Sequence, residues 1–295
     1  MKVLDLFSGI GGFSVGLERA GMQTIAFCEI EPFCQKVLNK HWPDVPIAND
    51  VTKLKYNQGV LYDDGKEIYK GTIDIVCGGF PCQDISTAGR QDGISEGTRS
   101  GLWSECARLL REVQPKFAIF ENVTNLLNGN RGDWFKRVLW DISQVGYDAE
   151  WHCIPASEIG AHHHRDRVWI MAYPNETFAA RRGLSSRIQK ELSQSYGRSD
   201  HWCAKHNVAY PLSWRQQRQG ELEQRIDPEA VKNWEAAKPV YGCVGQIWQT
   251  EPDLGRVVDG VWKKSYGHRL GALGNAVVPQ IPEIIGKAIQ GTSNG

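Results

Sequence analysis

The chain has 295 residues, its 34 basic and 34 acidic side chains balance, and 41% of its residues are hydrophobic. That length allows one large domain or two unequal ones around a sizeable core. No apolar run reaches membrane-spanning length and no secretory signal is present, so we expect a soluble cytoplasmic protein. Eight cysteines without a CxxC pair argue against a disulfide framework and indicate thiols in a reducing compartment.

Short apolar strands alternate with helical stretches through the first 170 or so residues. We expect strands at 3–7, 24–28, 73–77, 117–120 and 168–172. We expect helices between them at 12–20, 32–41, 102–113 and 133–145. This alternation predicts an α/β fold with a mostly parallel sheet and helices on both faces.

The sequence changes character near residue 174. Apolar periodicity fades there, and Arg, Gln, Ser and Trp become frequent up to Trp248. The stretch is too long for one loop in a compact domain, which predicts a second, smaller domain at 174–253. Residues 1–173 and 254–295 then form the larger domain, because helical spacing returns at 276–289 and predicts a helix that packs back on it.

A glycine-rich turn joins the first strand to the first helix. It reads Asp5-Leu6-Phe7-Ser8-Gly9-Ile10-Gly11-Gly12-Phe13 and is called the Gly-rich turn below. Glycines allow a ligand to approach the backbone, and a helix start offers free N–H groups. Glu29 and Asp50 follow further along, and acids after such strands can accept hydrogen bonds from ribose hydroxyls or an adenine amino group. The alternatives are a plain tight turn and two helix-capping or solvated acids.

A cysteine follows the apolar strand at 73–77. The segment reads Phe80-Pro81-Cys82-Gln83, and its proline restricts the backbone before the thiol. This placement puts Cys82 at the carboxyl end of a strand, where open α/β sheets hold their chemistry. A buried structural cysteine is the alternative. The stretch 83–101, with four glycines between Ser and Arg residues, is typical of a lid beside a reactive group or of a surface loop.

Glu121 begins the triplet Glu121-Asn122-Val123 after the strand at 117–120. Desolvation beside an apolar strand end raises a carboxyl pKa, so that the protonated acid can donate to a ring nitrogen. A capping or loop acid is the alternative.

Histidines and arginines crowd the segment His162-His163-His164-Arg165-Asp166-Arg167. Three consecutive histidines cannot all point at one ion from regular structure, and no acid or cysteine stands at zinc spacing, so we predict no metal. Arg165 and Arg167 would project to the same side of extended backbone, where they could grip an anion or a carbonyl oxygen.

Five segments together resemble the motifs of the C5-cytosine DNA methyltransferases, in the family's order and across nearly the whole chain. They are the Gly-rich turn, Phe80-Pro81-Cys82-Gln83, Glu121-Asn122-Val123, Arg165-Asp166-Arg167 and Leu273-Gly274-Asn275-Ala276-Val277-Val278-Pro279. The last of these is called the last motif below. The chain looks closest to compact bacterial and phage members. It departs from the pattern at His163, where Gln is usual.

The resemblance implies S-adenosylmethionine as the cofactor and a Rossmann-like methyltransferase sheet, with the smaller domain for target recognition. The implied cofactor residues are Phe7, Gly9, Gly11, Phe13, Glu29, Ile30, Asp50, Val51, Pro81, Leu102, Asn275 and Val277. The implied catalytic residues are the nucleophile Cys82, the base-holding Glu121, Arg167 for the base's O2, and Arg165 as support for that site or the backbone. Ser86 and Arg90 are implied as DNA contacts.

The implied activity is methylation of C5 of a cytosine flipped out of double-stranded DNA, through a covalent Cys82 adduct. An RNA cytosine methyltransferase and a catalytically silent DNA-binding protein are the alternatives. We expect a monomer on DNA and no membrane partner, but the sequence carries no signal for the oligomeric state. It leaves open the target sequence and whether a restriction endonuclease acts on the same site.

Overall fold

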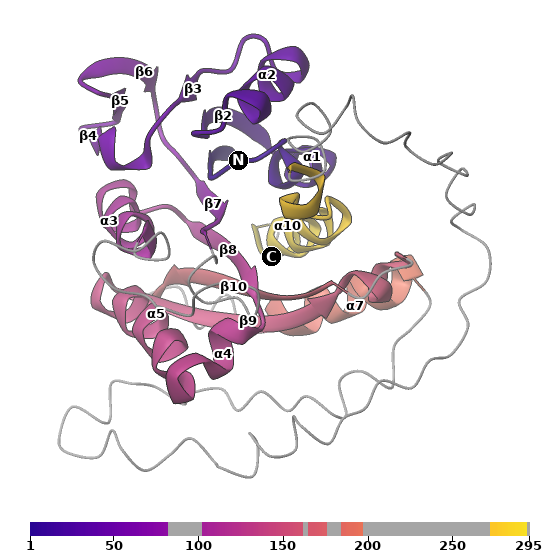
Figure 1. The fold of residues 1–295 in the computed structure, drawn as a ribbon. Coiled ribbons are helices and arrows are strands. Elements are labelled where there is room, and N and C mark those ends of the chain that lie inside the picture. Colours follow the sequence, from indigo (N-terminus) through magenta and orange to yellow (C-terminus); the bar gives the residue numbers. More distant parts are fainter. Residues whose placement is uncertain (82–101, 162–164, 176–183, 197–271, 294–295) are drawn as a thin grey trace, which may run out of the picture.

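The computed structural model describes residues 1–81, 102–161, 165–175, 184–196 and 272–293 (Figure 1). Its centre is a seven-stranded sheet of order β3-β2-β1-β7-β8-β10-β9. The strands are β1 (Lys2–Leu6), β2 (Gln23–Cys28), β3 (Ile47–Ala48), β7 (Ile75–Gly79), β8 (Phe117–Val123), β9 (Tyr147–Pro155) and β10 (Asp166–Pro174). The helices are α1 (Gly12–Arg19), α2 (Pro32–His41), α3 (Trp103–Val113), α4 (Asn125–Asn128), α5 (Asp133–Gln144), α7 (Leu184–Tyr196) and α10 (Gln280–Ser293).

The sheet is mostly parallel, as the sequence predicted. Strands β3, β2, β1, β7 and β8 run in one direction, whereas β10 runs antiparallel to both β8 and β9. Because β10 is reversed, it begins at the edge where β8 ends, and Arg167 lies opposite Val123. One edge of the sheet therefore collects the carboxyl ends of the parallel strands and the start of β10.

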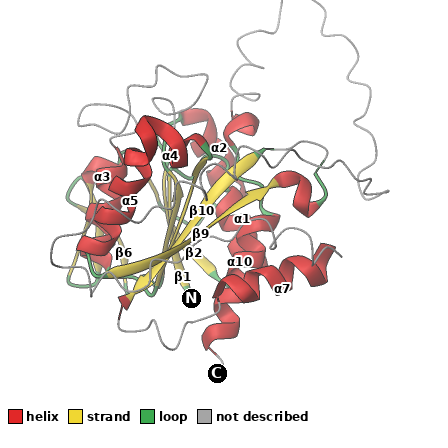
Figure 2. Cartoon of the chain, turned by 90° about the horizontal axis from the view of Figure 1, so that it is seen from below, coloured by secondary structure: helices red, strands yellow, loops and turns green. Residues whose placement is uncertain are grey.

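Helices cover both faces of the sheet (Figure 2). Helices α1, α7 and α10 bury one face, where Leu17, Leu184 and Ile285 pack in one core cluster with Trp169. Helices α3 and α5 bury the other face, where the Trp103 ring lies 5.1 Å from the Phe120 ring. The predicted α/β architecture is confirmed.

The last helix returns to the first one. Helix α10 packs against α1, and a Cβ built on Gly16 would lie 2.2 Å from the Pro279 carbonyl oxygen. Only a residue without a side chain permits this approach. The helix begins at Gln280 rather than at 276, because Pro279 biases the preceding Val278 towards extended backbone.

Five strands were missed by the sequence analysis, including the two-residue β3 at one edge of the main sheet. A three-stranded antiparallel sheet consists of β4 (Leu54–Asn57), β5 (Val60–Asp63) and β6 (Lys66–Lys70), and β9 lies at the other edge of the main sheet. Tight turns join the small sheet, with φ of 49° at Asp64 and 81° at Gly65. That Asp-Gly pair is the usual sequence signal of a two-residue hairpin loop.

Helix α7 lies within the stretch 174–253 and packs on the main sheet. Leu184 and Ile188 are buried in the core cluster that contains Trp169. The division into two domains stays a prediction, because 197–271 lie outside the described residues. No helix in the described part of the chain is long and apolar enough to cross a membrane.

Candidate active site

The Gly-rich turn is built around left-handed backbone and one buried acid. Phe7, Gly9 and Gly11 have φ of 51°, 55° and 87°. Gly11 precedes α1 and has no side chain that could cap it, while Oδ2 of Asp5 in β1 accepts the hydroxyl of Ser14 in the first turn of the helix at 2.7 Å. Burial raises the pKa of Asp5 to about 7. Strand β1 thus fixes the start of α1.

Glu29 binds directly to this turn. Its Oε2 accepts the Gly9 N–H at 2.6 Å, and its Oε1 accepts the Glu31 N–H at 2.8 Å. The side chain is buried. The carboxylate therefore connects the end of β2 to the glycine whose backbone a ligand would approach.

Asp50 and Ile30 line a hollow of about 310 Å³ beside this region, together with Asn49, Lys53, Asp63 and Asp64. Ile30 is 70% exposed, so its apolar side chain is open to solvent beside this hollow. Asp50 Oδ1 accepts the Thr52 N–H at 3.0 Å and so caps the 3₁₀ turn η1 (Val51–Lys53), while Val51 is buried. The capping alternative for Asp50 is thus correct, and the same residue also lines the hollow.

Glu121 and Arg167 form an ion pair at the shared edge of β8 and β10. Arg167 Nε lies 2.8 Å from Glu121 Oε1, and only 8% of Glu121 is exposed. Burial raises the pKa of Glu121, and the nearby charges of Arg167 and Arg165 oppose that rise. The direction of this shift agrees with the raised carboxyl pKa expected from the sequence.

Gly79 makes room for this carboxyl. Gly79 lies opposite Glu121 in the β7–β8 pairing, and a Cβ there would approach Glu121 Oε2 to 3.0 Å. Glu121 therefore sits directly over the strand end that leads into Phe80 and Pro81. Cys82 itself lies outside the described residues, as do Ser86, Arg90 and 162–164.

Asn122 follows Glu121 in β8, and the sequence pattern predicts no role for its side chain. Its Nδ2 donates to the Phe80 carbonyl at 3.1 Å, and its Oδ1 accepts the Val123 N–H at 2.9 Å. The side chain is 2% exposed, so both contacts are shielded from water. Asn122 fixes the backbone two residues before Cys82.

Arg165 points towards the last motif. Its Nη1 donates to the Gly274 carbonyl, and its Nη2 donates to the Ala276 carbonyl at 2.8 Å. Between these two acceptors stands the exposed Asn275. Of the two roles that the resemblance implied for Arg165, these contacts match support of the backbone.

The other predicted cofactor residues lie around the same edge. Phe13 is buried, with its ring edge-to-face with Trp169 at 5.5 Å between centroids. Pro81 and Leu102 are half-buried. Val277 packs against α1, since a Cβ on Gly12 would lie 2.4 Å from the Val277 carbonyl oxygen.

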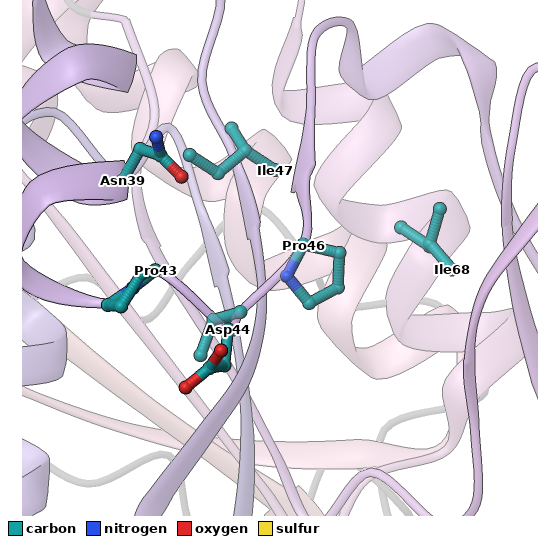
Figure 3. Close-up of a pocket in the computed structure, with 7 residues that line it drawn as sticks. Asn39, Pro43, Asp44, Pro46, Ile47 and Ile68 are labelled. Atoms are coloured by element: carbon teal, nitrogen blue, oxygen red, sulfur yellow. The ribbon is translucent and has the colours of Figure 1, made fainter.

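A larger hollow, of about 480 Å³, lies between the end of α2, β3 and β6 (Figure 3). It is lined by Asn39, Pro43, Asp44, Val45, Pro46, Ile47 and Ile68, none of which is a predicted site residue. Within the described ranges, no group of three or more His, Cys, Asp or Glu side chains could hold a metal ion.

Comparison with known proteins gives consistent matches. The family model described as C-5 cytosine-specific DNA methylase matches residues 1–235. A type II methyltransferase of Bacillus subtilis is 35% identical over 176 residues, which are 58% of this chain and 42% of that protein. One from Escherichia coli is 33% identical over 198 residues, 66% of this chain and 43% of that protein. The matched part thus spans less than half the length of these two relatives.

A solved structure shows the same fold. It is an E. coli prophage protein described as a DNA modification methyltransferase, with a TM-score of 0.56 and 18% identity, and the match covers 100% of both chains. The family match covers most of the chain, including the Gly-rich turn, the segment around Cys82, and the pair of Glu121 and Arg167. The chain belongs to the C-5 cytosine-specific DNA methylase family.

Proposed function

We propose that the protein is a DNA (cytosine-5)-methyltransferase that acts on a flipped cytosine within a short DNA sequence, with Cys82 as nucleophile. The observation that carries this proposal is the ion pair between the buried Glu121 and the partly exposed Arg167. It lies over the strand end that leads to Cys82, on the sheet edge that also carries the Gly-rich turn. A carboxyl and a guanidinium side by side match the N3–O2 edge of cytosine.

S-adenosylmethionine fits the residues at the neighbouring strand ends. Gly9 has open space where a side chain would stand, and Glu29 lies against its N–H group. The exposed Ile30 beside Asp50 offers an apolar surface and an acceptor, which suit an adenine ring and its amino group. Glu29 would hold the ribose, and the last motif would close the pocket with Asn275 and Val277. When bound, the cofactor supplies the methyl group.

The chemistry assigned to the chain's own residues starts at Cys82. Its thiolate attacks C6 of cytosine, which makes C5 nucleophilic enough to accept a methyl group. Glu121, whose raised pKa favours the protonated form, donates to N3, and Arg167 stabilises charge at O2. The proton on C5 then leaves, with water as the proposed base, and the thiol is eliminated.

The proposal also assigns roles to residues that lie largely outside the described ranges. Residues 83–101 would close over the flipped base and exclude water, with Ser86 and Arg90 near phosphate. Residues within 174–253 would read the target sequence. Double-stranded DNA is the proposed partner of a monomer, and type II relatives make a cognate endonuclease a reasonable second partner.

Transfer of labelled methyl groups to two substrates tests this proposal. The protein is incubated with labelled S-adenosylmethionine and either unmethylated duplex DNA or a mixture of unmodified transfer RNA. We expect label in DNA at least about tenfold above RNA. Label found mainly in RNA would show that RNA, not DNA, is the substrate. If folded, cofactor-bound protein transfers no label to either substrate, the result would favour a catalytically silent DNA-binding protein.

A further inference from the structure

Helix α3 carries a polar cluster on the side that faces β4. Arg108 Nε donates to Glu105 Oε2 at 2.8 Å, and its Nη1 donates to Glu112 Oε1 at 2.7 Å. These residues are spaced three and four apart, so all three lie on one side of the helix. The Arg108 side chain is 27% exposed, and the two acids raise its pKa.

Nη2 of the same guanidinium lies 2.7 Å from Glu105 Oε2 and also reaches across to another element. Arg108 Nη2 donates to the carbonyl oxygen of Val51 at 3.0 Å. Glu112 makes a second connection, because its Oε2 accepts the Tyr56 N–H at 2.9 Å. Helix α3 therefore binds the backbone of 51–56 at both ends, because Arg108 contacts Val51 and Glu112 contacts Tyr56. The side chains of Arg108 and Glu112 also bind each other.

Residues 51–56 form one wall of the proposed cofactor pocket. Val51 follows Asp50, which lines the hollow beside Ile30, and Leu102 lies directly before the first residue of α3. Arg108 thus connects the element that supplies Leu102 to the element that supplies Asp50 and Val51. The ion pairs within α3 form whether or not η1 is in place, whereas the bond to Val51 depends on the distance between these two elements.

We propose that Arg108 is a positioning residue for the adenine end of the cofactor: by holding the Val51 carbonyl, it sets the distance between the Asp50–Val51 wall and the Leu102 wall. The inference rests on the proposed function, since it assumes an adenosyl group in this pocket. Arginine is needed because its planar fork can reach three separate acceptors, whereas a lysine ammonium on a flexible stem cannot span the same set.

Binding of two ligands to three proteins tests the inference by calorimetry. The ligands are S-adenosylhomocysteine and 5′-methylthioadenosine, which lacks the amino-acid end. The proteins are wild type, Arg108→Lys and Arg111→Lys, the last being a matched change at an exposed position of the same helix. We expect Arg108→Lys to weaken both ligands roughly tenfold, the value of about one charge-assisted hydrogen bond. Arg111→Lys should stay within about twofold of wild type.

The outcomes separate this inference from the proposed function. If the wild-type protein binds neither ligand, the assignment of S-adenosylmethionine as the cofactor is wrong. Wild-type affinity in Arg108→Lys, or weakening of S-adenosylhomocysteine alone, overturns the role of Arg108 at the adenine end. If Arg108→Lys does not fold, Glu112→Gln replaces it: the amide oxygen still accepts the Tyr56 N–H but holds Arg108 less firmly, so both ligands should weaken about threefold. Unchanged affinities in that variant also overturn the inference.

Discussion

Arg167 Nε of β10 lies 2.8 Å from Glu121 Oε1 of β8, and these two neighbouring strands run in opposite directions. If β10 were parallel to β8, as the other central strands are, Arg167 would start from the opposite edge of the sheet. The reversed strand thus brings a cation to a carboxyl at the edge where the parallel strands end. This arrangement brings the side chains of Glu121 and Arg167 together at the proposed active site.

Replacing Glu121 by Gln should lower the rate of methyl transfer without affecting the cofactor pocket. The amide cannot give a proton to N3, so we expect kcat to fall about 10²- to 10³-fold. Affinity for S-adenosylhomocysteine should stay within about twofold. Glu67→Gln, an exposed change on β6, is the control. A Glu121→Gln enzyme with a wild-type kcat would remove Glu121 from the chemistry.

The rate should also fall as pH rises through the pKa of Glu121. Burial raises this pKa, and the protonated form is the donor, so the fraction of Glu121 that can donate is largest below that pKa and declines above it. A kcat profile against pH, measured for wild type and Glu121→Gln, checks the assignment. The variant should lack the decline on the alkaline side. A decline that persists unchanged in Glu121→Gln belongs to another group.

Arg165 and Arg167 should fail in different ways. Arg165 holds the carbonyls of Gly274 and Ala276, so Arg165→Lys should weaken S-adenosylhomocysteine binding about tenfold. Arg167→Lys should mainly lower kcat, because it contacts Glu121 and not the last motif. Calorimetry on both variants measures the affinity for S-adenosylhomocysteine, and kinetics on both measures kcat. Identical effects of the two substitutions would contradict separate roles.

The sequence could predict the strands that matter because each is an apolar run ended by glycine or a polar residue. It could also place Gly9, Glu29 and Glu121 at one edge of the sheet, since parallel strands share their carboxyl ends. It could not predict the partners of Arg165, which lie 109 and 111 residues further along the chain. The sequence also could not predict the contact of Arg108 with Val51, because every residue has a backbone carbonyl and the sequence does not mark which one accepts a hydrogen bond.

Asp5 should make the stability of the protein depend on pH. Its pKa is about 7 in the folded protein and 3.8 ordinarily, so the folded state holds a proton that the unfolded state has lost. This contribution is fully present below about pH 4 and is lost as pH rises to about 7, a difference of about 4 kcal/mol. Denaturant unfolding between pH 4 and 8 measures it.

The Asp5→Asn variant isolates this effect, because an amide does not titrate. Its unfolding free energy should vary less with pH than that of wild type, by up to about 4 kcal/mol across the window. Asp44→Asn, a change at an exposed acid, should keep the wild-type dependence. Equal slopes for Asp5→Asn and wild type would show that Asp5 has no raised pKa.

Gly16→Ala should loosen the contact between α1 and α10. The new Cβ would meet the Pro279 carbonyl oxygen at 2.2 Å and the Glu283 nitrogen at 2.8 Å, both of which are backbone atoms. We expect a loss of about 1–3 kcal/mol in unfolding free energy. Gly291→Ala is the control, since nothing lies within 4 Å of its Cβ position. A neutral Gly16→Ala would mean that the two helices are not tightly packed.

The most direct test is the position of the methyl group in the product. Wild type and Cys82→Ser are incubated side by side with S-adenosylmethionine and unmethylated duplex DNA, and the DNA is sequenced after bisulfite treatment. The account predicts protected cytosines in one short sequence context with wild type and none with Cys82→Ser. Protection that persists in Cys82→Ser, or no protected cytosine after treatment with cofactor-bound wild type, would contradict it.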